Sequence, residues 1–182
     1  MITLQGAFVL GGVARLAMAV IFAQAAWHAL RDVGAHAGSV AGYRLLPHWA
    51  VMAAAWALPL LSVAAALLLV VPVAAHAGAV LGLALMGVFT AAMAVNVQRG
   101  RVHIDCGCGG AQGQRISGAV VVRNLLLLAL LGVAVRFPAV GVLDTVTLVG
   151  VAGGGLALAA LYFAGSQLLA NRAAFRQAGF VA

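Results

Sequence analysis

Long apolar runs alternate along the chain with short polar segments. Five of the runs are long enough to cross a bilayer as helices, which takes about 20 residues each. They cover residues 7–29, 48–71, 77–97, 117–135 and 143–170. The pattern predicts an all-α integral membrane protein, a single domain that forms a bundle of five transmembrane helices.

Glycines and prolines divide these runs. Pro47 and Pro72 flank the second run, and five glycines between Gly100 and Gly113 predict irregular backbone across residues 98–116. Inside the runs, Gly78 with Gly82 and Gly150 with Gly154 repeat at a spacing of four. Helices in lipid depend on close backbone approach at such small residues, so we assign these glycines to packing.

Composition supports membrane insertion. Hydrophobic residues make up 65% of the chain and charged residues only 7%, against about 25% in an average soluble domain. All ten basic residues are arginines, and they are scattered between the runs instead of forming one basic face, which argues against nucleic acid and favours lipid headgroups. The first run lacks a basic start and contains Arg15, so we expect a retained helix instead of a cleaved signal peptide.

Five spans place most arginines on one side of the membrane. One arginine, Arg136, lies on the side that holds the N-terminus. Seven lie on the other side with the segment 98–116: Arg31, Arg44, Arg99, Arg101, Arg115, Arg172 and Arg176. The positive-inside rule therefore predicts that this segment is cytoplasmic.

The polar segment 98–116 holds the only two cysteines of the chain, Cys106 and Cys108, separated by Gly107. Positive charge favours the reactive thiolate, and four basic residues lie within ten positions: Arg99, Arg101, His103 and Arg115. A disulfide across one glycine is strained, and strain makes a disulfide a better oxidant. We predict a redox-active dithiol, with two alternatives: metal ligation, for which His103 supplies a third ligand, and inert structural thiols.

Arg123 and Asn124 are polar residues inside the fourth run. A charge near the bilayer centre costs at least ~2.5 kcal/mol and is normally paired or directed to a polar cavity. Arg123 has two interpretations: a side chain that reaches the headgroups, or a group that stabilises a thiolate or a bound anion. Asn124 is expected to cap or bond a nearby helix.

An oxidant in a membrane must pass its electrons on, which raises the possibility of a quinone cofactor. Trp27, His28 and Trp49 are candidates to line such a pocket. Aromatic residues at the ends of spans are also common interfacial anchors, so both interpretations stand.

A family resemblance rests on the cysteine segment. The segment Asp105-Cys106-Gly107-Cys108-Gly109-Gly110, followed by a short spacer and a span with Arg123-Asn124, resembles the methylamine-utilisation MauE family. The resemblance implies a bacterial inner-membrane protein that helps mature the disulfide-rich small subunit of methylamine dehydrogenase. It also implies a membrane-anchored, thioredoxin-like partner, MauD, with which Cys106 and Cys108 exchange disulfides.

This implied role favours a dithiol that is reachable from the periplasm, where disulfides persist, while the arginines place it in the cytoplasm. Three arrangements reconcile the two: an orientation inverted by complex formation, a loop folded back into the bundle, or electron transfer across the membrane.

Two functional classes compete. The first is a thiol-disulfide oxidoreductase, and the second is a non-catalytic anchor or scaffold for the thioredoxin-like partner. Solute transport has less support, because the spans show no acidic relay and no internal repeat.

Overall fold

The computed structural model describes residues 4–102, 104, 115–137 and 144–177, with the backbone alone at residues 4 and 172–177. Within these ranges the chain is helical apart from short connections. The helices are α1 (Leu4–Arg31), α2 (Val33–Gly42), α3 (His48–Val70), the short 3-10 helix η1 (Pro72–Ala74), α4 (Ala75–Gln98), α5 (Gly118–Arg136) and α6 (Thr145–Gln177).

Five segments are long and apolar enough to cross a membrane, which confirms the predicted fold class. They are Gln5–Arg31, His48–Val70, Pro72–Gln98, Gly118–Arg136 and Thr145–Asn171. Large apolar side chains cover their outer faces, including Leu67 of α3, Leu126 of α5 and Leu161 of α6. Such a surface suits a lipid environment, where outward-facing leucines cost nothing.

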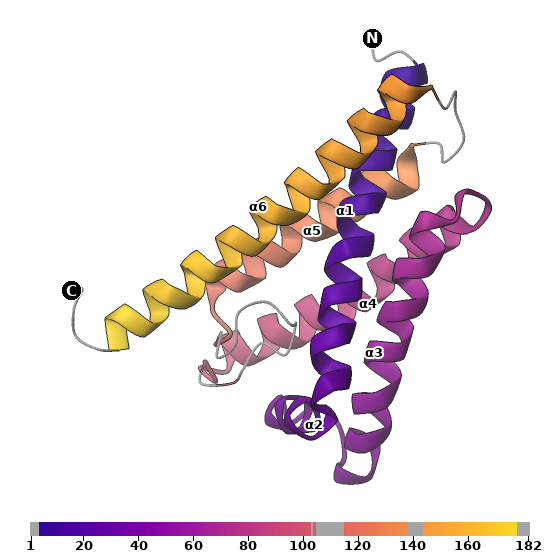
Figure 1. Cartoon of the computed structure of the whole chain (residues 1–182). Coiled ribbons are helices and arrows are strands. Elements are labelled where there is room, and N and C mark those ends of the chain that lie inside the picture. Colours follow the sequence, from indigo (N-terminus) through magenta and orange to yellow (C-terminus); the bar gives the residue numbers. More distant parts are fainter. Residues whose placement is uncertain (1–3, 103, 105–114, 138–143, 178–182) are drawn as a thin grey trace.

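Helix α1 is the centre of the bundle. It packs against α3, α5 and α6, while α4 packs between α3 and α5 (Figure 1). Met18, Ile21 and Phe22 of α1 are buried in a core that also includes Leu69 of α3 and Leu131 of α5.

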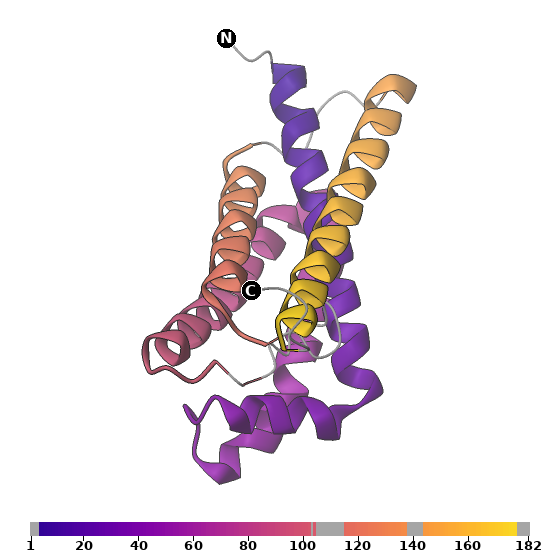
Figure 2. The same ribbon diagram turned by 90° about the vertical axis from the view of Figure 1, so that its left-hand side faces the viewer.

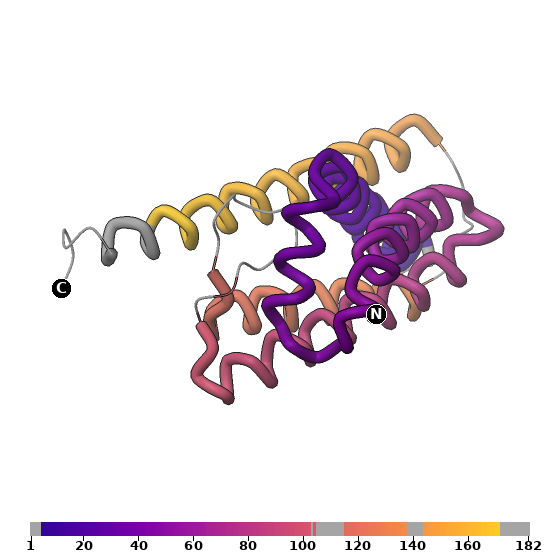
Figure 3. Tube along the Cα trace, turned by 90° about the horizontal axis from the view of Figure 1, so that it is seen from below, coloured from indigo at the N-terminus to yellow at the C-terminus, as the bar shows by residue number. Residues whose placement is uncertain are grey.

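Helix α6 lies along α1 and stands apart from α5. Among the described residues it makes no contact with α5 comparable to its contact with α1. Seen from below, α6 follows one side of the molecule while α4 and α5 follow the other (Figure 3).

The first connection contains a helix that the sequence analysis treated as a loop. Asp32 caps α2, since its Oδ1 accepts a hydrogen bond of 2.8 Å from the backbone N–H of Ala35. Helix α2 packs against α3 and lies across the lower end of the bundle (Figures 1 and 2). We call this the α2 end; it also holds the end of α4 and the start of α5.

The packing role predicted for glycine is confirmed at three of the four paired positions. A Cβ added at Gly78 would lie 2.6 Å from the backbone N of Leu69, and one at Gly82 or Gly154 would lie 2.9 Å from a neighbouring side chain. At Gly150 it would meet open space. Gly78 therefore sets how closely α4 approaches α3.

Gly78→Ala is expected to destabilise the protein by about 1–3 kcal/mol, because backbone atoms of α3 must shift to admit the methyl group. Gly87→Ala is the matched control in the same helix, since its Cβ meets nothing within 4 Å. There we expect no loss, or a gain of up to about 1 kcal/mol from helix propensity. Thermal unfolding in detergent micelles measures both, and equal effects would contradict the packing role.

Candidate dithiol site at the α2 end

The two cysteines, together with Asp105 and His103, lie outside the described residues, but the ends of their loop are described. The backbone N–H of Ile116 donates to the carbonyl of Ile104 at 2.9 Å. Ile116 is only 1% exposed. The loop that carries Cys106 and Cys108 therefore starts and ends at one fixed point.

A small apolar cluster supports that point. Tyr43, Met93, Ile116 and Val120 are buried together, and Ile104 packs against them. A Cβ at Gly42 would lie 3.2 Å from Cγ2 of Ile104, so the end of α2 also touches the start of the loop. We call these side chains the loop base; they hold the loop on α4, α5 and the end of α2.

Helix α4 ends in a motif that turns the chain towards the loop. The N–H of Arg101 donates to Asn96 O at 2.9 Å and the N–H of Gly100 donates to Val97 O at 3.0 Å. These are the two bonds of a Schellman motif, and Gly100 has the positive φ of 71° that the motif requires. Gly100 thus ends the helix and turns the chain towards Ile104.

Three of the arginines predicted to assist the dithiol lie at the two ends of the loop. Arg99 caps α4 and is exposed, Arg101 is half-buried, and Arg115 is exposed just before the loop base. Their placement raises the positive potential where the loop begins and where it ends.

Arg123 makes described polar contacts both to α6 and within its own helix. Its Nη1 donates to Ser166 Oγ at 3.1 Å, and its Nη2 donates to Asn124 Oδ1 at 3.2 Å. Its guanidinium carbon lies 5.2 Å from the centre of the Tyr162 ring, within the range of a cation–π contact. We call Arg123, Asn124, Tyr162 and Ser166 the Arg123 cluster; it joins α5 to α6.

Asn124 connects this cluster to the loop base. Its side chain is fully buried, and its Nδ2 donates weakly to Met93 Sδ at 3.8 Å. Met93 in turn packs with Ile116 in the loop base. The expectation that Asn124 bonds a nearby helix therefore has a defined partner on α4.

An open groove borders the Arg123 cluster. It has a volume of about 570 Å³ between α5 and α6, with Ile21 of α1 at its floor and Arg123 and Tyr162 on its wall. Leucines of both helices line the rest, among them Leu126, Leu127, Leu130, Leu158, Leu161 and Leu168. We call it the α5–α6 groove.

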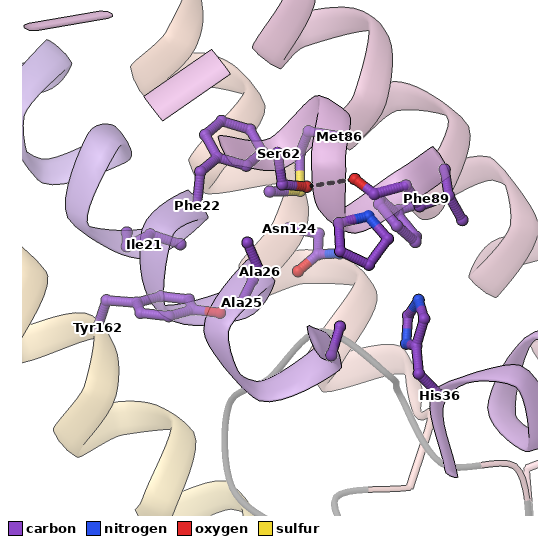
Figure 4. A pocket seen from close by; sticks show the side chains of 13 residues that line it. Ile21, Phe22, Ala25, Ala26, His36, Ser62, Met86, Phe89, Asn124 and Tyr162 are labelled. Atoms are coloured by element: carbon purple, nitrogen blue, oxygen red, sulfur yellow. Dashed lines mark hydrogen bonds between the residues drawn. The ribbon is translucent and has the colours of Figure 1, made fainter. Parts of the chain in front are cut away.

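A second, smaller cavity of about 40 Å³ lies inside the bundle. His36 reaches into it from α2, opposite Asn124 and Tyr162 (Figure 4). Burial lowers the pKa of His36, and its Nε2 has no hydrogen-bond partner among the described residues. The space holds about three water molecules, which would satisfy such a polar atom.

The structure does not bring the three residues suggested for a quinone pocket into either cavity. Trp49 is 82% exposed at the start of α3, and Trp27 is 57% exposed with Arg31 stacked 4.6 Å from its ring centre. His28 is half-buried beside Trp27. Exposed tryptophans at the ends of spans have the placement of interfacial anchors.

Tyr162, Ser166 and His36 were not predicted as site residues from the sequence. Tyr162 and Ser166 are four residues apart in an apolar run, so they share one helix face. Two polar residues four positions apart in an apolar run therefore indicate a polar site on one face of the helix.

Comparison with known proteins identifies a family. The family model described as "Methylamine utilisation protein MauE" matches residues 7–137, a range that includes the dithiol loop. No solved structure matches the chain.

The relatives that carry the name methylamine utilization protein MauE include the following three. The one from Paracoccus denitrificans is 43% identical over 69% of this chain and 68% of its own length. The one from Paracoccus versutus is 42% identical over 83% and 82%, and the one from Methylorubrum extorquens is 38% identical over 86% and 85%. Since the family model covers more than half of the chain and these relatives match most of it, the protein belongs to the methylamine utilisation protein MauE family.

Proposed function

We propose that this protein is a thiol-disulfide exchange protein of the bacterial inner membrane that supports maturation of methylamine dehydrogenase. Its exchanging pair is Cys106 and Cys108. The partner, as the family resemblance implies, is a membrane-anchored, thioredoxin-like protein that in turn acts on the small subunit of the dehydrogenase.

The observation that carries the proposal is the fixed loop base. Exchange requires that two sulfurs of one loop be presented together to a second protein. The Ile116–Ile104 hydrogen bond and the buried Ile116 anchor both ends of the loop at one place on the bundle. Arg99, Arg101 and Arg115 around that place favour the thiolate form on which exchange depends.

The exchange step balances without a further reactant. A thiolate of the partner attacks the Cys106–Cys108 disulfide and forms a mixed disulfide, and the second partner thiolate then displaces it. The partner leaves with a disulfide, and Cys106 and Cys108 remain as two thiols. Each cycle thus moves two electrons from the partner to this protein.

Trapping of the mixed disulfide tests the proposal. Cys106→Ser and Cys108→Ser leave one thiol each. That thiol can attack the disulfide of the oxidised partner, but no second thiol is left to complete the exchange, so at least one of the two variants should accumulate a covalent species with the partner on non-reducing gels. A reductant should cleave this mixed disulfide, and the double-serine variant should not form it. Absence of the species from both single variants would contradict exchange.

Sidedness has its own measurement, because the arginine pattern and the implied partner point to opposite faces of the membrane. An impermeant thiol reagent labels Cys106 and Cys108 in intact cells if the loop is periplasmic, and only in inverted vesicles if it is cytoplasmic.

A further inference from the structure

The exchange cycle leaves a reduced pair that must be reoxidised. This inference rests on the proposed function: two electrons and two protons have to leave Cys106 and Cys108 before the next cycle. An electron acceptor dissolved in the same membrane, such as a molecule with a polar ring and an apolar tail, requires a binding site on the bundle. That site must open to lipid, have room for the ring and the tail, and offer a polar contact for the ring.

The α5–α6 groove has the required size and access. Its volume of about 570 Å³ lies within the usual 300–1,000 Å³ of ligand pockets. Leu126, Leu161 and Leu168 on its rim are exposed on the outer face of the bundle. An unbranched or prenyl chain fits such a wall of leucines, because every contact is apolar.

The wall of the groove also carries a hydrogen-bond donor and an aromatic face. Arg123 and Tyr162 both line it. A guanidinium has only donors, so it suits a ligand whose polar atoms are acceptors, such as the carbonyl oxygens of a quinone. The Tyr162 ring beside it offers a flat surface for a ring to stack on.

The depth of this polar site separates a quinone from a phospholipid. Arg123 lies five residues after the start of α5, and Ser166 lies five residues before Asn171, where the apolar span of α6 ends. Each distance is about 7.5 Å along its helix. A charged phosphate belongs at the level of the span ends, whereas an uncharged ring with acceptor oxygens suits a donor below them.

The interior cavity is not an alternative site for the ring. At about 40 Å³ it holds only a few waters, although Ile21 and Tyr162 line both this cavity and the groove. The ring must therefore lie on the groove side of Tyr162.

We propose that the α5–α6 groove binds a membrane quinone, with its ring at Arg123 and Tyr162 and its tail along the leucines. As Cys106 and Cys108 form their disulfide, two electrons and two protons pass to the quinone, which leaves as the quinol. The Arg123 cluster is joined through Asn124 and Met93 to the loop base, where the described ends of the cysteine loop meet.

Photolabelling with an azidoquinone tests the site in the purified, full-length protein. Peptide mass spectrometry should place the label on α5 and α6, and decylubiquinone should compete for it. Gly165→Phe fills the groove, because Gly165 lines it and its Cβ meets nothing within 4 Å. We expect labelling to fall about ten-fold.

Gly153→Phe is the matched control. Gly153 lies on the same helix, is exposed, has equally open space and does not line the groove, so labelling should not change. Arg123→Gln should weaken labelling by a smaller factor, because the amide keeps an NH2 donor group. Equal labelling of Gly165→Phe and wild type, or competition by phospholipid instead of decylubiquinone, would overturn the quinone site.

The labelling is repeated in the double-serine variant so that the two proposals fail separately. Binding should persist there, while only the wild type with reduced thiols should convert decylubiquinone to its quinol, read by ultraviolet absorbance. Trapped mixed disulfide without specific labelling rejects the quinone site alone. Specific labelling without any mixed disulfide rejects the exchange function, while the quinone site remains supported.

Discussion

Replacement of both Cys106 and Cys108 by serine is expected to abolish maturation of methylamine dehydrogenase while the amount of protein in the membrane stays normal. A serine oxygen forms no disulfide, so exchange stops completely. The described contacts of the loop base come from Ile104, Ile116 and their neighbours, which the change leaves in place, so we expect the base to keep its packing. Dehydrogenase activity and the disulfide state of its small subunit measure maturation, and an immunoblot of membranes measures insertion.

Arg115→Gln is the matched change at the same loop. It keeps both thiols and removes one exposed positive charge next to the loop base. Because the charge only favours the thiolate, we expect exchange to become a few-fold slower instead of being lost. Normal maturation in the double-serine variant would contradict the proposed function and would favour the alternative, a non-catalytic anchor for the thioredoxin-like partner.

The transmembrane helices could be predicted from the sequence because each one is a long apolar run, and lipid permits no other structure for such a run. Helix α2 could not. Its ten residues, Val33–Gly42, are mostly small, and a helix of this length is marginal alone. Packing against α3 and the cap at Asp32 stabilise it, and neither is visible in a hydrophobicity pattern.

The candidate site could be predicted from the sequence only where its signal is local. Two cysteines in a glycine-rich break are a local signal, and so are the arginines beside them. The α6 partner of Arg123 is not local: Ser166 lies 43 residues away, and their hydrogen bond depends on where α6 lies relative to α5. For Trp27 and Trp49, residue type suggested either a pocket or interfacial anchors, and only the fold shows that both side chains are exposed.

Arg15 shows how the bundle accommodates a charge by bonding it to backbone carbonyls. The spans contain no acidic residue, and Arg15 is buried in the middle of α1. Its Nη2 donates to the carbonyl of Ala134 at 3.0 Å and also to the carbonyl of Phe137. These carbonyls belong to the end of α5, where the last turn has no intrahelical donors and the helix dipole is negative.

Arg15→Met is therefore expected to destabilise the protein by about 3 kcal/mol, although it removes a charge from the membrane. Hydrogen bonds from a charged donor contribute about 1.5–3 kcal/mol each, and a terminal carbonyl left without a donor in an apolar setting is costly. Arg136→Met removes an exposed arginine at the same end of α5 and should change stability by less than about 0.5 kcal/mol. Arg15→Lys should recover only part of the loss, because a single ammonium does not reproduce the guanidinium fork that bonds two carbonyls. Thermal unfolding of the three variants in detergent measures the differences. If Arg15→Met were as stable as Arg136→Met, the carbonyls at the end of α5 would not depend on hydrogen bonds from Arg15 of α1.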